Sequence, residues 1–153
     1  MITLEPVGVV VGGRAEAVDD DWGGVEAVIR LDESRFGPDA VAGLEEFSHL
    51  VVVFFFHLVG PDEVQSGARH PRGNPEWPAV GMFAQRARMR PNRIGVSTCA
   101  LVAVDGLDLH VRGLDAVDGS PVLDVKPYVL EFEPRQADVR QPAWVTDLMR
   151  GYY

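Results

Sequence analysis

Residues 99–112 read CALVAVDGLDLHVR, and this stretch decides the fold class. Two runs of β-forming residues flank the dipeptide Asp105-Gly106. Asp-Gly between such runs is typical of a tight turn that joins two antiparallel strands. The stretch therefore predicts a β-hairpin with strands at 99–104 and 107–112.

Other short runs also have the composition of strands. Residues 50–56 (LVVVFFF) are apolar at every position, as in a strand buried on both faces. Residues 38–47 and 142–150 instead predict short helices, the first with a proline in its first turn. The remaining predicted strands cover 7–11, 25–31, 122–125 and 129–132. Many short strands with few short helices favour an all-β barrel or sandwich.

Composition narrows the class of protein. A chain of 153 residues with 46% hydrophobic and 24% charged residues fits one soluble domain. The longest apolar run is too short to span a bilayer, and the N-terminus lacks the features of a signal peptide, so we expect a cytoplasmic protein and no membrane partner. The single cysteine excludes an intrachain disulfide, and the spacing of the four histidines predicts no metal site. No Gly-x-Gly-x-x-Gly follows a first strand, which argues against a Rossmann site.

Charge is distributed unevenly along the chain. The net charge is −9, yet residues 69–93 hold six arginines and one acidic residue, so this window carries +5 and the rest carries −14. A local basic face on an acidic body can still guide a polyanion. The alternative is six surface arginines that are solvated or paired with nearby carboxylates.

Two further patterns point to chemistry. His57 closes the apolar run, where a barrel opens and a ligand can be contacted. Taken alone, however, a histidine at this position more often has its ring satisfied by a neighbouring backbone carbonyl. Asp124, Lys126 and Tyr128 alternate with other residues, so in a strand they share one face. That face is either a pocket wall or a surface salt bridge beside a tyrosine.

Six segments together resemble the signature of the TsaA-like domain family (TrmO), the tRNA N6-threonylcarbamoyladenosine methyltransferases. They follow the family's order and approximate spacing between residues 5 and 132. The segments are LEEFSHL at 44–50, the apolar strand ending at His57, HPR at 70–72, GMFAQR at 81–86, RPNRIGVS at 90–97 and DGSPVLDVKPY at 118–128.

The resemblance implies a single small β-barrel domain with short peripheral helices, which binds S-adenosyl-L-methionine and works as a homodimer on tRNA. It places this domain at residues 1–135, followed by a C-terminal extension at 136–153 that forms a short helix. Cofactor contacts are expected at Phe56, His57, Arg86, Val96, Leu114, Asp115, Ala116, Val117 and Asp118. Asp124, Lys126 and Tyr128 are the catalytic candidates, and the RNA candidates are Arg72, Arg88, Arg90, Asn92 and Arg93.

The implied reaction is methylation of N6 of threonylcarbamoyladenosine in the anticodon loop. Asp115 and Asp118 are suited to ribose hydroxyls or the cofactor's amino group, and Arg86 to its carboxylate. The sequence departs from the family pattern at residues 12–24, which are acidic and lack proline, and at Arg93, which replaces a typical proline. Two other readings stay open: the same cofactor with another RNA or a small molecule as acceptor, and a non-catalytic barrel that only binds S-adenosylmethionine.

Overall fold

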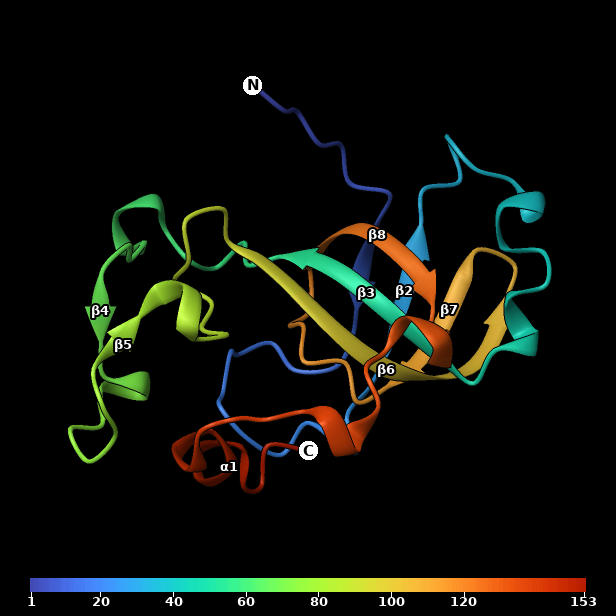
Figure 1. Cartoon of the computed structure of the whole chain (residues 1–153). Coiled ribbons are helices and arrows are strands. Elements are labelled where there is room, and N and C mark those ends of the chain that lie inside the picture. The colour runs from blue at the N-terminus through green and yellow to red at the C-terminus, as the bar shows by residue number, and fades with distance from the viewer.

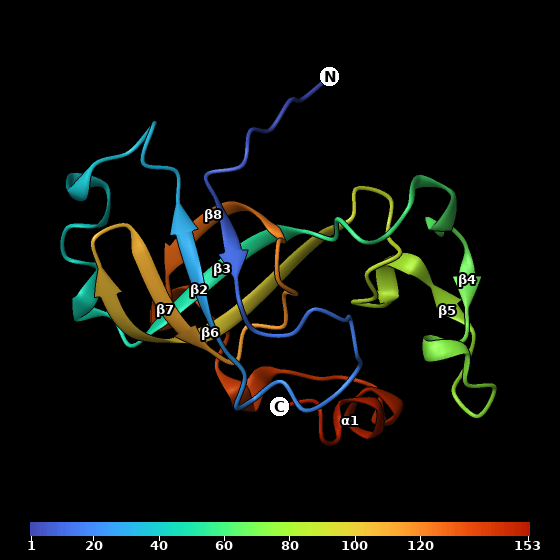
Figure 2. The ribbon, with the colours of Figure 1, turned by 180° about the vertical axis from the view of Figure 1, so that it is seen from behind.

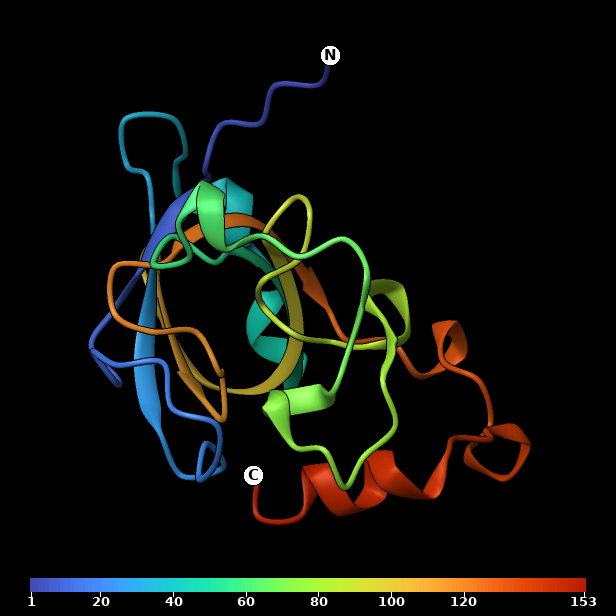
Figure 3. The same cartoon turned by 90° about the vertical axis from the view of Figure 1, so that its left-hand side faces the viewer.

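Six antiparallel strands close into a barrel in the computed structural model, which describes residues 1–153. The order around the barrel is β1-β2-β7-β6-β3-β8, and a separate pair, β4 and β5, lies in a lobe at one end (Figure 1). Viewed along its axis, the barrel is a ring with the lobe crossing in front of it (Figure 3). The strands are β1 Gly8–Val11, β2 Glu26–Leu31, β3 His49–Phe55, β4 Ala68–Arg69, β5 Val80–Gly81, β6 Ile94–Asp105, β7 Asp108–Arg112 and β8 Pro121–Pro127.

The predicted hairpin is confirmed and forms one side of the barrel. Strands β6 and β7 pair antiparallel up to Asp105 and Asp108, and Gly106 takes a left-handed conformation with φ of 59° in the turn. Strand β6 begins earlier than predicted, so residues of the RPNRIGVS segment also belong to the barrel wall. The all-β barrel class predicted from the sequence is therefore correct.

Strand β3 has only one fully buried face. Leu50, Val52 and Phe54 point into the core, whereas the residues between them are half-buried. The prediction of a strand buried on both faces is thus wrong, because no layer completely covers the outer side of this part of the barrel. The inward set joins side chains from all six barrel strands in one core cluster.

Two local predictions failed at short apolar segments. The helix expected at 38–47 is two 3₁₀ turns, Pro38–Val41 and Leu44–Glu46, because Gly43 between them has φ of 84°. The strand expected at 129–132 is a 3₁₀ turn, Leu130–Phe132, whose large apolar side chains are exposed. The C-terminal helix is present as α1, Ala143–Met149. None of the helices has the length and apolar character needed to cross a membrane.

The lobe between β3 and β6 projects from the barrel, as the view from behind also shows (Figure 2). Two buried residues hold it together. The Met82 side chain is almost fully buried, and the Gln85 amide donates hydrogen bonds to the carbonyls of Arg69 at 3.0 Å and Val80 at 2.9 Å. The long irregular loop expected from the sequence is therefore an ordered unit with its own small sheet.

Candidate active site at the lobe end of the barrel

Three connections converge at the end of the barrel that carries the lobe. They are residues 12–25 between β1 and β2, 56–93 between β3 and β6, and 113–120 between β7 and β8. Backbone hydrogen bonds tie them together: Asp118 N donates to Arg14 O at 2.7 Å, and Gly119 N donates to Val10 O at 2.8 Å. Most cofactor residues implied by the resemblance lie in these connections.

The 113–120 connection combines core residues with carboxylates. Leu114, Ala116 and Val117 are buried, so their side chains belong to the packing at the barrel end. Asp118 accepts a hydrogen bond from Gly12 N at 2.9 Å, which ties the connection to the acidic loop. Asp115, half-buried between these apolar residues, is the carboxylate that faces the barrel wall.

Asp115 has two hydroxyl partners from distant parts of the chain. One oxygen accepts from Ser97 Oγ on β6, and the other accepts from the Tyr152 hydroxyl. Burial and the negative charge of Asp115 raise the pKa of the Cys99 thiol to about 12, and the same two causes raise the pKa of Tyr152 well above its usual range. The Asp115 carboxylate therefore acts on both of these neighbouring groups.

His57 lies beside the 113–120 connection. A side-chain carbon added at Gly119 would come within 3.5 Å of its Nε2 atom. Its Nδ1 atom is buried and has no hydrogen-bond partner, so a backbone carbonyl does not satisfy this nitrogen. An unpaired buried nitrogen costs free energy unless a ligand or water pairs with it, so His57 is a candidate for such a contact.

Phe56 has a packing role next to His57. Its ring meets that of Phe54 edge-to-face, with centroids 5.2 Å apart, and its N–H donates to Arg93 O at 2.8 Å. Both rings crowd the Cα of Gly95. Phe56 thus fixes the backbone from which His57 projects.

Arg86 and Val96 meet on the outer face of the barrel wall. The Arg86 guanidinium donates to Val96 O at 2.5 Å, and the Val96 side chain is 44% exposed. They line a hollow of about 420 Å³ whose other lining residues are Val51, Ser97, Thr98, Glu133 and Tyr153. A larger hollow of about 790 Å³, at the opposite end, is lined by none of the predicted site residues, so we place the candidate site at the lobe end.

The three catalytic candidates are not all brought together. Asp124 and Lys126 form an ion pair at 2.7 Å on the outer face of β8. Asp124 lies opposite Val53, which in turn lies opposite Val96, so two strand spacings of about 5 Å each separate it from the hollow. Tyr128 lies past the end of β8, where its ring meets that of His49 edge-to-face at 6.4 Å. Four residues of extended chain put it roughly 13 Å from Asp124.

The arginines of the basic window are tied to the protein itself. Arg88 donates to Ala17 O at 2.8 Å and Arg93 to Val59 O at 2.6 Å, and the Arg93 guanidinium stacks on the Phe55 ring at 4.6 Å. The other contacts are Arg69 with Met89 Sδ, Arg72 with Asp20, and Arg90 with the carbonyls of Gln85 and Ala87. Asn92 lies in the turn before β6 and is exposed. These arginines therefore shape the lobe, with their remaining donors available to a ligand.

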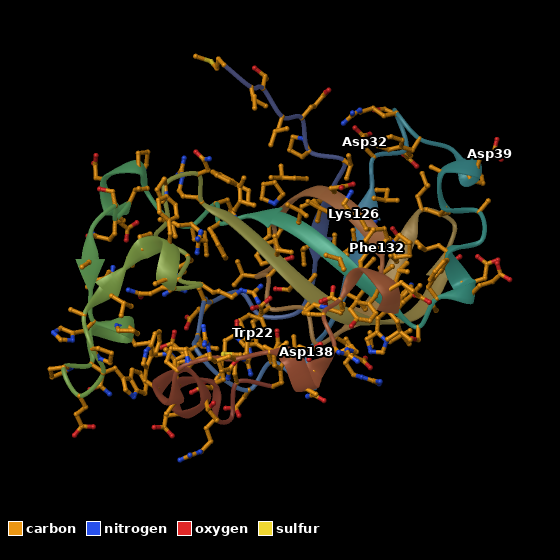
Figure 4. The ribbon with its side chains drawn as sticks, in the orientation of Figure 1. Trp22, Asp32, Asp39, Lys126, Phe132 and Asp138 are labelled. Atoms are coloured by element: carbon orange, nitrogen blue, oxygen red, sulfur yellow. The ribbon has the colours of Figure 1, made fainter.

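The acidic loop 12–24 folds over the same end of the barrel. Arg14 stacks on the Trp22 ring at 4.7 Å and donates to the carbonyls of Asp20 and Asp21, each at 2.5 Å. Trp22 is buried and lies near the C-terminal segment, whereas Asp32 and Asp39 lie at the opposite end (Figure 4). An arginine–tryptophan pair thus organises this loop without the proline typical of the family.

Ser97, Tyr152 and Tyr153 belong to the site but were not predicted. Ser97 lies within the RPNRIGVS segment, and the period of two that places Gly95 and Cys99 in the barrel interior also places Ser97 there. Tyr152 reaches Asp115 across 37 residues of sequence. No local sequence pattern predicts a contact between residues so far apart in the chain.

The family model for the tRNA-methyltransferase O N-terminal domain matches residues 21–134. A tRNA (adenine(37)-N6)-methyltransferase of Escherichia coli is 44% identical over 97 residues, which cover 60% of this chain and 40% of that protein. A probable S-adenosyl-L-methionine-binding protein of Pyrococcus abyssi is 34% identical over 145 residues, covering 89% of this chain and 73% of that protein.

A crystal structure of TrmO from Pseudomonas aeruginosa superposes with a TM-score of 0.74 at 28% identity, covering 94% of this chain and 62% of that one. The matched part makes up only 22% of the mouse and 23% of the human tRNA (adenine(37)-N6)-methyltransferase. A family model that matches most of the barrel, with a solved structure of the same fold, confirms the resemblance drawn from the sequence motifs. The chain belongs to the family of the tRNA-methyltransferase O N-terminal domain.

Proposed function

We propose that this protein transfers the methyl group of S-adenosyl-L-methionine to N6 of threonylcarbamoyladenosine in the anticodon loop of tRNA. Relatives that share the domain are named as tRNA (adenine(37)-N6)-methyltransferases. The observation that carries the proposal is the orphaned, buried Nδ1 of His57, which lies beside the Asp115–Asp118 connection that the resemblance assigns to the cofactor.

The residues at the lobe end fit the cofactor's chemistry. Asp115 and Asp118 offer carboxylate oxygens to ribose hydroxyls or an amino group, and His57 Nδ1 takes a further polar partner. Arg86 has guanidinium donors left for a carboxylate after its bond to Val96 O. When bound, the sulfonium supplies a methyl group already activated for displacement, so the protein's main task is orientation.

Asp124 is our candidate for accepting the proton that N6 loses. It shares the outer face with Val96 and the hollow lined by Arg86, whereas Tyr128 lies further along and contacts His49. Lys126, which pairs with Asp124 at 2.7 Å, fixes the carboxylate on this face. The arrangement favours Asp124 over Tyr128 as the base and gives Lys126 a positioning role.

One observation favours functions other than the methylation of this tRNA nucleoside. The arginines that would contact RNA, Arg72, Arg88, Arg90 and Arg93, already donate to groups of the protein. A free basic face is not needed by a methyltransferase that acts on another RNA or a small molecule. It is not needed either by a barrel that only binds S-adenosylmethionine. These two functions are the alternatives that the experiment below separates.

We also propose that the protein acts as a cytoplasmic homodimer. Apolar side chains remain exposed on the outer face of the barrel and on the turn next to it, with Val96 and Phe132 as examples. Phe132 and Lys126 lie on the same side of the molecule (Figure 4). Burying such side chains against a second copy removes apolar surface from water. Sedimentation at micromolar concentration tests this assignment, and a monomer would contradict it.

The decisive experiment combines cofactor binding with nucleoside analysis. Calorimetry should detect S-adenosylmethionine binding, and mass spectrometry should detect N6-methylated threonylcarbamoyladenosine after incubation with tRNA that lacks this methyl group. Asp124→Asn should lower turnover by about a hundredfold, the usual range for losing a general base. Asp108→Asn is the matched control, because Asp108 also forms an ion pair, with Arg30 at 2.9 Å, but lines the hollow at the opposite end of the barrel.

Each negative result has its own meaning. Unchanged tRNA in the presence of cofactor-bound protein would remove the tRNA assignment and leave the alternatives. Equal rates for wild type and Asp124→Asn would remove Asp124 as the base.

A further inference from the structure

The C-terminal segment 151–153 is docked against the candidate site rather than projecting from the molecule. The Tyr152 hydroxyl donates to Asp115, and the Tyr152 and Tyr153 rings meet edge-to-face at 4.8 Å. Tyr153 lines the same hollow as Arg86 and Val96. We call residues 151–153 the C-terminal strap.

Backbone contacts hold the strap to the acidic loop. Asp21 N donates to the Gly151 carbonyl at 2.9 Å, and Trp22 N donates to the Tyr152 carbonyl at 2.8 Å. Gly23 packs closely against the strap, since a side-chain carbon added there would lie 2.6 Å from the Tyr153 carbonyl carbon. That approach is possible only for glycine. The strap therefore has a specific binding place formed by residues 21–23.

We infer that Tyr152 is a positioning residue of the cofactor site and that Tyr153 forms part of its wall. This inference rests on the proposed function. The Tyr152 hydroxyl and Ser97 Oγ each bind one oxygen of Asp115, so the carboxylate plane is fixed from both sides. Each carboxylate oxygen has a second lone-pair position, which stays available to a cofactor hydroxyl or amino group.

The buried surroundings of Asp115 strengthen its hydrogen bond with Tyr152. The carboxylate lies beside the buried residues Leu114 and Cys99, where a hydrogen bond to a charged group is stronger than in water. Without Tyr152, one oxygen of Asp115 loses its donor and only the bond from Ser97 still orients the carboxylate. Both tyrosines lie outside residues 21–134, the part matched by the family model, so the domain match itself assigns them no role.

Three variants test the inference. Tyr152→Phe removes only the hydroxyl, and Gly23→Ala displaces the strap. Gly24→Ala is the matched control, because a methyl group there meets no atom within 4 Å. Calorimetry should show that Tyr152→Phe and Gly23→Ala weaken S-adenosylmethionine binding about tenfold, the usual effect of losing a hydrogen bond to a charged group. Gly24→Ala should bind like the wild type.

Steady-state kinetics separates positioning from general stability. Tyr152→Phe should raise KM for S-adenosylmethionine about tenfold and leave kcat within about twofold. A merely structural role would lower the amount of active protein and leave KM unchanged. Unchanged affinity in both variants would overturn the inference. Tighter binding would also overturn it, because the strap would then compete with the cofactor. If the wild type itself does not bind S-adenosylmethionine, the proposed function fails instead.

Discussion

Gly95 lies on β6 where the aromatic rings of Phe54 and Phe56 meet. A side-chain carbon at this position would come within 2.7 Å of Phe54 Cζ and 2.8 Å of Phe56 Cζ. Phe54 is buried in the core and Phe56 packs against it, so Gly95→Ala should lower the free energy of unfolding by about 1–3 kcal/mol, as overpacking does. Denaturant unfolding measures this change. Gly81→Ala, which has open space around it, is the control, and equal stability of the two variants would contradict the prediction.

Cys99 is buried two residues after Ser97 on the same face of β6, near Asp115. Burial and this charge raise the pKa of its thiol from 9.0 to about 12. The folded protein therefore holds this proton more tightly than the unfolded chain, and the resulting stability is complete below pH 9 and is lost as the pH rises toward 12. Unfolding free energy should fall with a slope of up to about 1.4 kcal/mol per pH unit. Between pH 9 and 10, Cys99→Ala should show a shallower slope; an unchanged slope would contradict the assignment.

Strands could be predicted from the sequence where the turn residues and the residue composition both indicated β-structure. The Asp105-Gly106 turn identified the β6–β7 hairpin, and the apolar run at 50–56 identified β3. The strand expected at 129–132 failed because its apolar residues have no neighbouring strand to pair with and no core to enter. Local composition does not encode either condition.

Site residues follow the same rule at longer range. His57 was predicted because it closes a recognisable strand, and Asp115 because the resemblance covers the connection that holds it. The contact of Asp115 with Tyr152 depends on how the chain folds back, and so could not be predicted from the sequence. The sequence located the basic window and left open whether it faces a polyanion, but it could not show that its arginines bind backbone carbonyls of the same chain.

The lobe and the acidic loop are joined by arginine contacts. Arg88 donates to Ala17 O at 2.8 Å, and Arg72 pairs with Asp20 at 3.2 Å. We expect Arg88→Ala to speed amide hydrogen exchange in residues 12–24 with little change in the barrel strands, because it removes a local tether and leaves the core intact. Arg135→Ala, which breaks an exposed ion pair with Asp138, is the control. Exchange that rises equally in β3 and β6 would show that the contact stabilises the whole fold instead.

At the scale of the molecule, the basic lobe and the acidic loop contact each other, so part of their charge is already paired within the chain. The net charge is −9, and the basic lobe is folded against the acidic loop that closes the same end of the barrel. Internal pairing reduces the field available to attract a polyanion. Recognition of RNA would then depend more on contacts with unstacked bases than on phosphate binding alone.

Phe83 is the side chain best placed for such a base contact. It lies on the lobe, next to the buried Met82 and close in sequence to Arg86, and it is 82% exposed. Stacking of one unpaired base on an aromatic ring contributes about 1–3 kcal/mol. Phe83→Ala should therefore weaken tRNA binding by about tenfold or more, with S-adenosylmethionine affinity unchanged. Phe47→Ala is the control, because Phe47 is also exposed but lies just before β3, at the other end of the barrel. Binding assays at two salt concentrations give both quantities. If the loss follows Phe47 rather than Phe83, RNA binds the other end of the barrel, and if neither variant changes affinity, base stacking on these exposed aromatic residues does not contribute.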